Sequence, residues 1–405
     1  MDIIQRFLNY VSIDTQSDES SLTSPSTDKQ FNLAHVLYDE LKCLGISDLK
    51  LTDNCIVYAR IPANTDEDYD RIGFIAHMDT SPDFKGKDVK PRIIKNYDCS
   101  AITLNEELQI VLDPHNFECL KRDIGSDLIV TDGTTLLGAD DKAGIAIIMD
   151  MAQRIMSDNT VKHGDIAIAF TPDEEVGRGT ENFDTEYFNV DYAYTVDGGN
   201  ADEIEYENFN ADSACVKVHG LSIHPGSAKG KMLNSQLVAF EFNSLLRTFD
   251  NPAYTEGYEG FNHLTSINGD CENTVMNYII RNHDKNLLLK QENDFKNAME
   301  FLNRKYGDGT VEVEIVHTYA NMREFIEKRM DIIDKVKRIM REMNMEPKSS
   351  PIRGGTDGAS LTYMGLPCPN LGTGGRNYHG KYEYLSINEF LIMSELVYKI
   401  VTNKW

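Results

Sequence analysis

The sequence lacks the features that mark secreted, membrane-spanning or disulfide-stapled proteins. Its N-terminus has no basic start followed by an apolar run and a small-residue cleavage site. Its most apolar stretch, residues 144–151, is interrupted by Asp150 and is far too short to span a bilayer. The seven cysteines are odd in number, widely scattered and without a CxxC pair, which is typical of reduced thiols. We therefore expect a cytoplasmic protein.

Positive charge is also scarce. The 40 Lys and Arg residues face 65 Asp and Glu residues, which gives a formal net charge of −25 at pH 7. Such an acidic surface repels phosphate backbones and anionic lipids, so neither nucleic acid nor a membrane is expected as a partner. Carboxylates, which the chain has in excess, can hold divalent cations when several of them gather in one place.

Strand-like and helix-like segments alternate along most of the chain. The length of 405 residues exceeds that of one ordinary core, so two domains or one domain with an insertion are expected. The predicted helices cover residues 31–44 and 143–155, and the predicted strands cover 71–76, 165–170 and 192–196. This alternation predicts an α/β domain with a mostly parallel mixed sheet covered by helices on both faces. The last helix is expected to begin with a capping box formed by Ser386 and Glu389.

A different order of elements occupies residues 208–320. We predict strands at 215–219, 264–268, 275–281 and 311–317, and helices at 233–246 and 287–306. Their order is β-α-β-β-α-β, which is typical of a small ferredoxin-like α+β domain. We therefore expect a larger catalytic domain of residues 1–207 and 321–405, with an inserted lid or dimerisation domain of residues 208–320.

Two motifs place His and Asp residues where apolar strands end. In IGFIAHMDT, His77 and Asp79 are two residues apart, so both side chains leave the strand from one face. One can bind a metal while the other accepts a hydrogen bond from the second ring nitrogen of the imidazole. In AYTVDGG, Asp197 ends another strand beside glycines that let the backbone approach closely. Taken alone, each motif is more typical of a strand that simply ends in polar residues.

Two further motifs supply adjacent carboxylates. In TTLLGADDKAG, Asp140 and Asp141 precede a helix, where a carboxylate either bridges two cations or caps the helix. In AIAFTPDEEVG, an apolar strand leads into Asp173, Glu174 and Glu175. An acidic run usually indicates a solvated surface, but the apolar strand directly before this one argues against that interpretation. Adjacent carboxylates cannot both point at one metal. One of them is therefore free to act as a base, and their repulsion raises a pKa toward neutrality.

His379, in the glycine-rich loop NYHGK, completes this set of residues. Two His and at least three carboxylates are what two zinc ions about 3.5–4 Å apart need in aminopeptidase-type sites. Each motif is weak alone, so the hypothesis of a site for two Zn²⁺ ions per subunit rests on their combination.

The motifs and their order resemble those of the M20 metallopeptidase family, in which the motifs of the metal site flank an inserted domain in the sequence. The stretches TTLLGADDKAGIA, AFTPDEEVG, AYTVDGG, TEGYEGF, PIRGGTDGA, GLPCPN and NYHGK carry the resemblance, which covers essentially the whole chain. Stretches outside the metal site resemble those members of the family that remove the N-terminal residue of tripeptides. The resemblance therefore implies a zinc-dependent aminopeptidase that acts on small peptides.

The resemblance also implies a role for each motif residue. The metal ligands would be His77, Asp140, Glu175, Asp197 and His379. Asp140 would bridge the two ions, Glu174 would be the general base, and Asp79 would orient His77. The family also has a cis peptide bond after the bridging aspartate, which corresponds here to Asp140–Asp141.

Four further residues are candidates for binding the substrate. Arg353, flanked by glycines in RGGTDG, suits the charged end of a short peptide because a guanidinium binds a carboxylate bidentately. Arg281 is a second candidate for this task, and a surface ion pair is the alternative for either arginine. By resemblance, His224 would steady the tetrahedral oxyanion, often from a neighbouring subunit, and Asn273 would act in the same region. This implies a homodimer that forms through the inserted domain.

Four other functions share parts of this pattern. A dipeptidase, a carboxypeptidase or an amide-deacylating enzyme of the same family would have the same metal site. A non-catalytic metal-dependent binding protein is an alternative from another class. Such a relative is expected to have lost the base or a histidine, whereas this sequence keeps Glu174, His77 and His379.

Overall fold

The computed structural model describes residues 1–404, and they divide into two compact units. Unit 1 comprises Met1–Tyr206, Glu324–Ser350 and the residues from Thr356 on, whereas unit 2 comprises Glu207–Arg323 and Pro351–Gly355. Glu207, residues 321–323 and Pro351–Gly355, which we expected in the larger domain, belong to unit 2. The amide of Ile352 donates to the carbonyl of Glu207, and the amide of Met322 donates to Oδ1 of Asn208. No helix among the described residues is long and apolar enough to cross a membrane.

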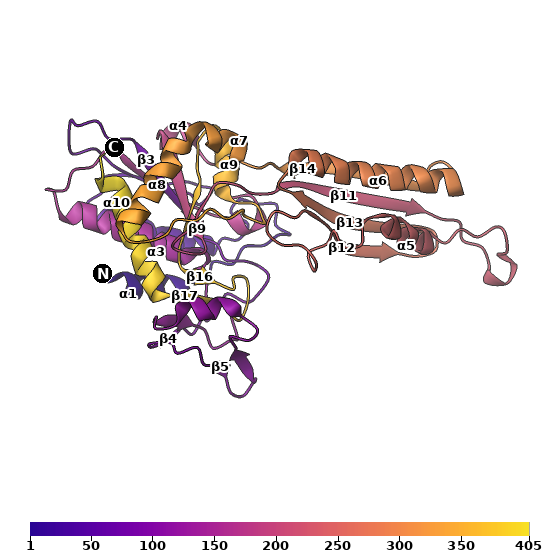
Figure 1. The fold of residues 1–405 in the computed structure, drawn as a ribbon, viewed down its shortest axis with the longest axis horizontal. Helices are drawn as coiled ribbons and strands as arrows, with labels where there is room; N and C mark the ends of the chain where they lie inside the picture. Colours follow the sequence, from indigo (N-terminus) through magenta and orange to yellow (C-terminus); the bar gives the residue numbers. More distant parts are fainter. Residues whose placement is uncertain (405) are drawn as a thin grey trace. The chain divides into compact units, whose positions relative to one another are not determined.

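A seven-stranded mixed sheet forms the centre of unit 1 (Figure 1). Its order is β1 (Asp48–Leu51), β2 (Val57–Ile61), β8 (Ile166–Thr171), β3 (Ile72–His77), β9 (Tyr192–Gly198), β15 (Asn370–Gly372) and β10 (Ile204–Glu205). The four strands β8, β3, β9 and β15 are parallel to one another, and the strands at both edges pair antiparallel. Strands β3 and β8 are buried along their whole length. This confirms the predicted α/β fold with a mixed sheet.

Helices cover both faces of this sheet. Successive side chains of a buried strand point to opposite faces, so both faces need to be covered. On one side, Ala193 of β9 packs in a cluster with Phe188 of α4 (Thr185–Phe188) and Leu361 of α9 (Asp357–Tyr363). The next residue, Tyr194, points the other way and donates its hydroxyl to the carbonyl of Ile332 in α8 (Met330–Glu342).

Four further helices pack in unit 1. Helix α3 (Ala139–Ser157) contacts β3, β9, α1 (Ile3–Val11) and α10 (Ile387–Thr402), whereas α2 (Gln30–Cys43) contacts β1 and β2. A smaller sheet, which we did not predict, has the order β16 (Gly375–Arg376), β17 (Tyr384–Ser386), β7 (Leu128–Val130) and β4 (Arg92–Ile94). A two-stranded sheet pairs β5 (Ile102–Asn105) with β6 (Ile110–Leu112).

Unit 2 is a four-stranded antiparallel sheet with two helices. Its elements follow the predicted order β11 (Asn210–His219), α5 (Ser235–Leu245), β12 (Phe261–Gly269), β13 (Asn273–Asn282), α6 (Lys285–Tyr306) and β14 (Val311–Tyr319). The strand order β12-β13-β11-β14 is that of a ferredoxin-like domain, as predicted.

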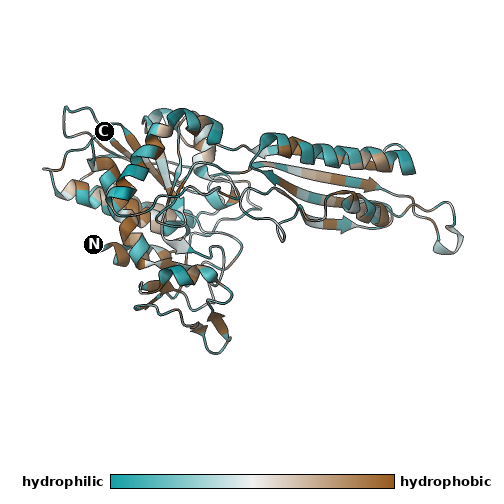
Figure 2. Cartoon of the chain, in the orientation of Figure 1, coloured by the Kyte–Doolittle hydropathy of each residue, from teal (hydrophilic) through white to brown (hydrophobic). Residues whose placement is uncertain are grey.

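Both helices of unit 2 pack on one face of its sheet. The core between them contains Val216 and Met276 from the strands and Phe242 and Phe295 from the helices, all fully buried. The side of α6 visible in Figure 2 is largely hydrophilic, as expected for a helix with one face on a core.

Candidate metal centre

The carboxyl ends of three neighbouring parallel strands bring the candidate residues together in unit 1. His77 is the last residue of β3, Asp197 lies at the end of β9, and Glu174–Val176 form a 3-10 turn shortly after β8. Parallel strands end at the same edge of a sheet, and this is where ligands bind in open α/β folds. The fourth contributor is the start of α3, which carries Asp140 in its first turn.

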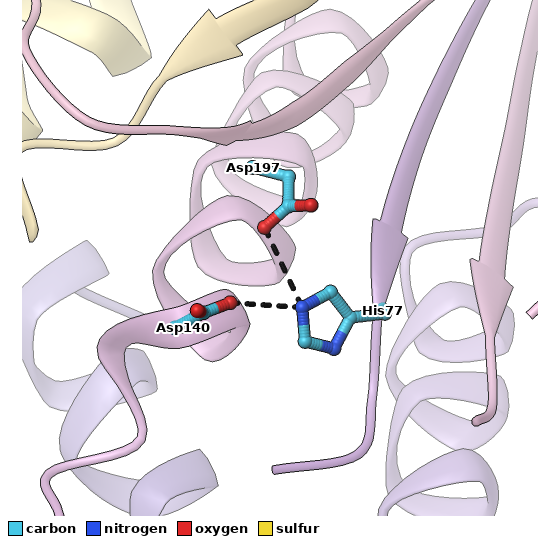
Figure 3. A group of neighbouring side chains, drawn as sticks. All are labelled: His77, Asp140 and Asp197. Atoms are coloured by element: carbon cyan, nitrogen blue, oxygen red, sulfur yellow. Dashed lines mark hydrogen bonds and ion pairs between the residues drawn. The ribbon is translucent and has the colours of Figure 1, made fainter. Parts of the chain in front are cut away.

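A first group of potential ligands consists of His77, Asp140 and Asp197 (Figure 3). The Nε2 atom of His77 lies 2.9 Å from Oδ1 of Asp140 and 3.4 Å from Oδ1 of Asp197. Figure 3 shows both carboxylates pointing at the same ring nitrogen from two different elements. One imidazole and two carboxylates therefore face a common point.

Asp140 also belongs to a second group, with Glu175 and His379. The Nε2 atom of His379 lies 3.3 Å from Oδ2 of Asp140 and 2.9 Å from Oε2 of Glu175. The two oxygens of Asp140 thus serve different groups, Oδ1 on the side of His77 and Oδ2 on the side of His379. A carboxylate shared in this way is in the position of a bridging ligand.

The donor set fits divalent cations. The Oε1 atom of Glu175 is buried and has no hydrogen-bond partner within residues 1–404. This oxygen is therefore available to bind a cation at the second group. Burial raises the pKa of Glu175 to about 8, and the charge of Asp140 adds to this shift. Burial likewise raises the pKa of Asp197 to about 6. Carboxylates so close together repel one another, and bound cations would relieve that repulsion.

Glu174 lies beside both groups without belonging to either. Burial raises its pKa well above the usual range, and the charge of Asp197 acts in the same direction, although the charge of His77 opposes it. A carboxyl group that is not needed as a ligand is available to accept and release a proton.

Asp79 connects the end of β3 to the turn that carries both glutamates. Its backbone oxygen lies 3.0 Å from Nδ1 of His77, and its Oδ1 atom lies 3.3 Å from the same nitrogen. Its carboxylate also accepts the backbone N–H groups of Glu174 at 3.0 Å and of Glu175 at 3.2 Å. The sequence suggested the contact with His77 but gave no sign of the contacts with the turn.

Backbone contacts fix Asp140. The Asp140–Asp141 peptide bond is cis, as the family resemblance implied. Glu383, a buried residue that we did not predict for the site, accepts the N–H groups of Leu137, Gly138 and Asp140 at 2.6, 2.8 and 3.1 Å. The only signal for it was an acidic residue four positions after His379 in HGKYEY, which does not identify a partner.

The DDKAG motif also explains how α3 approaches the sheet. The carboxylate of Asp141 accepts the N–H groups of His77 at 3.3 Å and of Gly144 at 3.1 Å. A Cβ atom on Gly144 would lie 1.8 Å from the carbonyl oxygen of Val196, so only glycine permits this close packing at the end of β9.

The substrate-binding candidates belong to unit 2. Arg353 lies over the ring of Phe209, 5.1 Å from its centroid. Its Nη1 atom donates to the carbonyls of Gly257 and Glu259, and its Nη2 atom donates to the carbonyl and hydroxyl of Thr255. The guanidinium therefore holds the loop of residues 255–259 in this structure.

Two other candidates lie on β13. Arg281 donates through Nη1 to the carbonyl of Asp212 at 3.1 Å, and its guanidinium lies 5.2 Å from the ring centroid of Tyr319. Asn273 is exposed at the opposite end of the strand, and its Oδ1 atom lies 3.0 Å from Nδ1 of His219.

His224 is exposed in the segment that follows β11, and its Nδ1 atom accepts the N–H of Gly226. Arg353 lies beside Phe209, which immediately precedes β11, whereas His224 lies five residues after the end of this ten-residue strand. With a rise of about 3.3 Å per residue, roughly 30 Å separates the two ends of β11.

Comparisons with known proteins show which family the chain matches. Residues 132–403 match the model of the family described as "Peptidase family M20/M25/M40". The chain is 52% identical to a protein named Peptidase T from Alkaliphilus oremlandii (strain OhILAs), over 99% of this chain and 98% of the relative.

Two solved structures have a similar fold. The crystal structure of the aminopeptidase PepT from Bacillus cereus ATCC 10987 has a TM-score of 0.78 at 22% identity, and covers 99% of this chain and 97% of that chain. A Bacillus subtilis protein described as a dinuclear metal binding peptidase from the M20 family has a TM-score of 0.62 at 14% identity. It covers 98% of this chain and 97% of that chain.

Proposed function

The chain belongs to peptidase family M20/M25/M40, and we propose that it is an aminopeptidase that removes the N-terminal residue of tripeptides with the help of two zinc ions. The observation that carries the proposal is the shared carboxylate of Asp140, which joins two groups of ligands while Glu174 stays outside both. Half of the sequence is identical to that of a Peptidase T over nearly the whole length of both chains.

The five ligands that we assign are His77, Asp140, Glu175, Asp197 and His379. Imidazole nitrogens and carboxylate oxygens are the donors that zinc takes in catalytic sites, so zinc is the metal that we assign. Bound zinc ions supply a Lewis acid that activates water and polarises a carbonyl group.

The residues of the chain perform the proton transfers and hold the site together. Glu174 accepts the proton of the attacking water and later delivers it to the leaving amine. Asp79 keeps this base in place, because its carboxylate holds the backbone N–H groups of Glu174 and Glu175 while its Oδ1 and carbonyl oxygens face Nδ1 of His77. Positions fixed in advance in this way lower the reorganisation needed during the reaction.

Arg353 is our candidate for binding the C-terminal carboxylate of the peptide. Its two Nη atoms make four hydrogen bonds to the loop of residues 255–259. Binding a carboxylate bidentately therefore requires Arg353 to exchange at least some of these contacts for contacts with the substrate. Arg281 is the alternative cation for this task.

His224 is our candidate for a donor to the oxyanion, with Asn273 in the same region. Strand β11, with His224 beyond one end and Arg353 beside the other, is roughly 30 Å long, whereas an extended tripeptide spans only about 10 Å. This separation argues against both residues of one copy of unit 2 binding the same tripeptide. If both act on one substrate, His224 comes from the partner subunit of a homodimer that forms through unit 2.

The cell compartment that we propose is the cytoplasm. All seven cysteines are free thiols, and Cys43 is exposed. Exposed thiols persist where the compartment is reducing.

A panel of peptides tests this function. Dipeptides, tripeptides, tetrapeptides and acylated amino acids are incubated with zinc-loaded protein, and the products are identified by mass. The proposal predicts that tripeptides are cleaved fastest and yield the free N-terminal residue and a dipeptide. Release of the C-terminal residue would instead identify a carboxypeptidase, and cleavage of dipeptides or of acylated amino acids alone would identify a dipeptidase or a deacylase.

A further inference from the structure

Asp173, the residue before the two site glutamates, is fully buried and is held by neutral hydrogen-bond donors. Its Oδ2 atom accepts the backbone N–H of Ser26 at 2.7 Å, and its Oδ1 atom accepts the hydroxyl of Ser26 at 2.5 Å. Gln30 donates from Nε2 to the same Oδ1 atom at 2.7 Å. A segment more than 140 residues earlier in the chain thus holds the turn that carries Glu174 and Glu175.

The contact between Gln30 and Asp173 is reciprocal. Gln30 donates to the carboxylate of Asp173 and accepts the backbone N–H of Asp173 with its Oε1 atom at 3.2 Å. Gln30 is fully buried at the start of α2, so its amide has a fixed place. A carboxamide at this position both donates and accepts, which neither a carboxylate nor an apolar side chain of the same size can do.

The backbone of Asp173 explains why such a contact is needed. Asp173 has a φ angle of +57° and immediately precedes the 3-10 turn of Glu174–Val176. Residues other than glycine rarely adopt this left-handed conformation, and it persists when the surroundings fix it. Gln30 and Ser26 fix this conformation, because Gln30 accepts the backbone N–H of Asp173 and both residues donate to its carboxylate.

The same N-terminal segment also holds the loop after β3. The Nε2 atom of Gln16 donates to the carbonyls of Ser81 at 3.0 Å and of Phe84 at 2.8 Å. The backbone N–H of Ser17 donates to the carbonyl of Thr80 at 3.1 Å. Residues 16–30, which we call the N-terminal brace, therefore contact the loops that follow β3 and β8.

We propose that Gln30 is a positioning residue, which acts through Asp173 to hold the base Glu174 and the ligand Glu175 in place. The inference rests on the proposed function for the role of Glu174, but its contacts do not depend on the substrate. The side chain of Gln30 is hydrogen-bonded to Ser26, Thr27 and Asp173, none of which we assign to the metal or the substrate. Loosening the turn shifts Glu174 relative to the reacting water, and a shift of that kind lowers turnover far more than it weakens peptide binding.

Three variants test this role. Gln30→Glu keeps the shape but sets one carboxylate against another, Gln30→Ala removes the contact, and Asn32→Ala changes an exposed residue of the same helix as a control. We expect both Gln30 variants to lower kcat by roughly 10- to 100-fold with little change in KM, because small displacements of a catalytic group have effects of this size. The larger loss is expected for Gln30→Glu. Asn32→Ala should match the wild type.

A double variant supplies a rescue. Adding Asp173→Asn to Gln30→Glu again gives the pair one carboxylate and one carboxamide, so kcat should recover in part. If the role of Gln30 were purely structural, the double variant would recover the unfolding midpoint, and neither the single nor the double variant would show a selective effect on kcat.

Zinc binding gives a readout that does not depend on activity. Calorimetric titration of metal-free protein should show that Gln30→Glu weakens one of two binding steps, because Glu175 belongs to one ligand group only. The proposal is overturned if both Gln30 variants keep the kcat and both zinc affinities of Asn32→Ala. It is also overturned if they lower only the unfolding midpoint. If the wild type cleaves no tripeptide, the proposed function fails, and the zinc titration still decides the role of Gln30.

Discussion

Replacing each of the two adjacent glutamates in turn by glutamine tests the proposal that Glu174 is the base and Glu175 is a metal ligand. Glu175 contributes Oε2 to the group with Asp140 and His379, and its Oε1 atom is buried without a partner among the described residues. Glu174 belongs to neither group. Glu174→Gln should therefore leave metal content near that of the wild type, whereas Glu175→Gln should lose one of two ions.

The expected magnitude follows from the role of each residue. Loss of a general base lowers turnover by a factor on the order of 10²–10⁴, which corresponds to about 3–5 kcal/mol of activation free energy. A glutamine at position 174 keeps the shape of the side chain and cannot accept the proton. Since Asp79 holds the backbone of this turn, the substitution should not displace it.

The assay combines steady-state kinetics on one tripeptide with metal content by mass spectrometry on the same preparation. Glu181→Gln, an exposed glutamate shortly after the turn, is the matched control. Loss of metal in Glu174→Gln with full metal in Glu175→Gln would mean that the two roles are exchanged. A Glu174→Gln variant as active as the control would refute the assignment of a base altogether.

Three further predictions concern residues around this centre. If Arg353 binds the C-terminal carboxylate, C-terminally amidated tripeptides should be poorer substrates by roughly 1.5–3 kcal/mol in kcat/KM, and equal rates on free and amidated peptides would exclude that role. His224→Ala should keep both metals and lose turnover by a factor of about 10²–10³. Mixing it with Glu174→Gln should restore activity through hybrid dimers, so proven subunit exchange without activity would exclude a contribution from the partner. Glu383→Gln should lower the free energy of unfolding by about 1.5–3 kcal/mol, because an amide nitrogen would then face a backbone N–H in place of a carboxylate oxygen. Denaturant unfolding of metal-free protein measures this loss, and an unchanged midpoint would contradict it.

The strand-end positions could be predicted because periodicity and a local motif agree there. His77 and Asp197 each follow a run of buried apolar residues, so the sequence places them at the edge of a parallel sheet. The β-α-β-β-α-β order of unit 2 could be predicted for the same reason, since the hydrophobic residues of each element have a clear period and each element has a clear end.

Contacts with backbone groups were not predictable. Glu383 and Asp173 are both buried carboxylates that bind N–H groups far away in the sequence. A backbone N–H has no sequence signature, so nothing in the residues around Glu383 or Gln30 indicates the partner. The small sheet around β7 was missed because its strands are only two or three residues long.

One local prediction was wrong. Ser386 stands at the N-cap of α10, as expected, but its hydroxyl caps no helix N–H group. Glu389, the other half of the expected capping box, binds Arg376 and Arg122 and accepts the N–H of Ala201. Ion pairs with two arginines outcompete a local capping bond, and the sequence around the helix contains only one of these arginines.

The most direct test of the central claim is tripeptide hydrolysis by protein that has been stripped of metal and then reloaded. Chelation should abolish the release of the N-terminal residue, and zinc should restore it with a stoichiometry of two ions per chain, because Asp140 joins two groups of ligands. Undiminished release of that residue by protein verified to be free of metal would contradict the account.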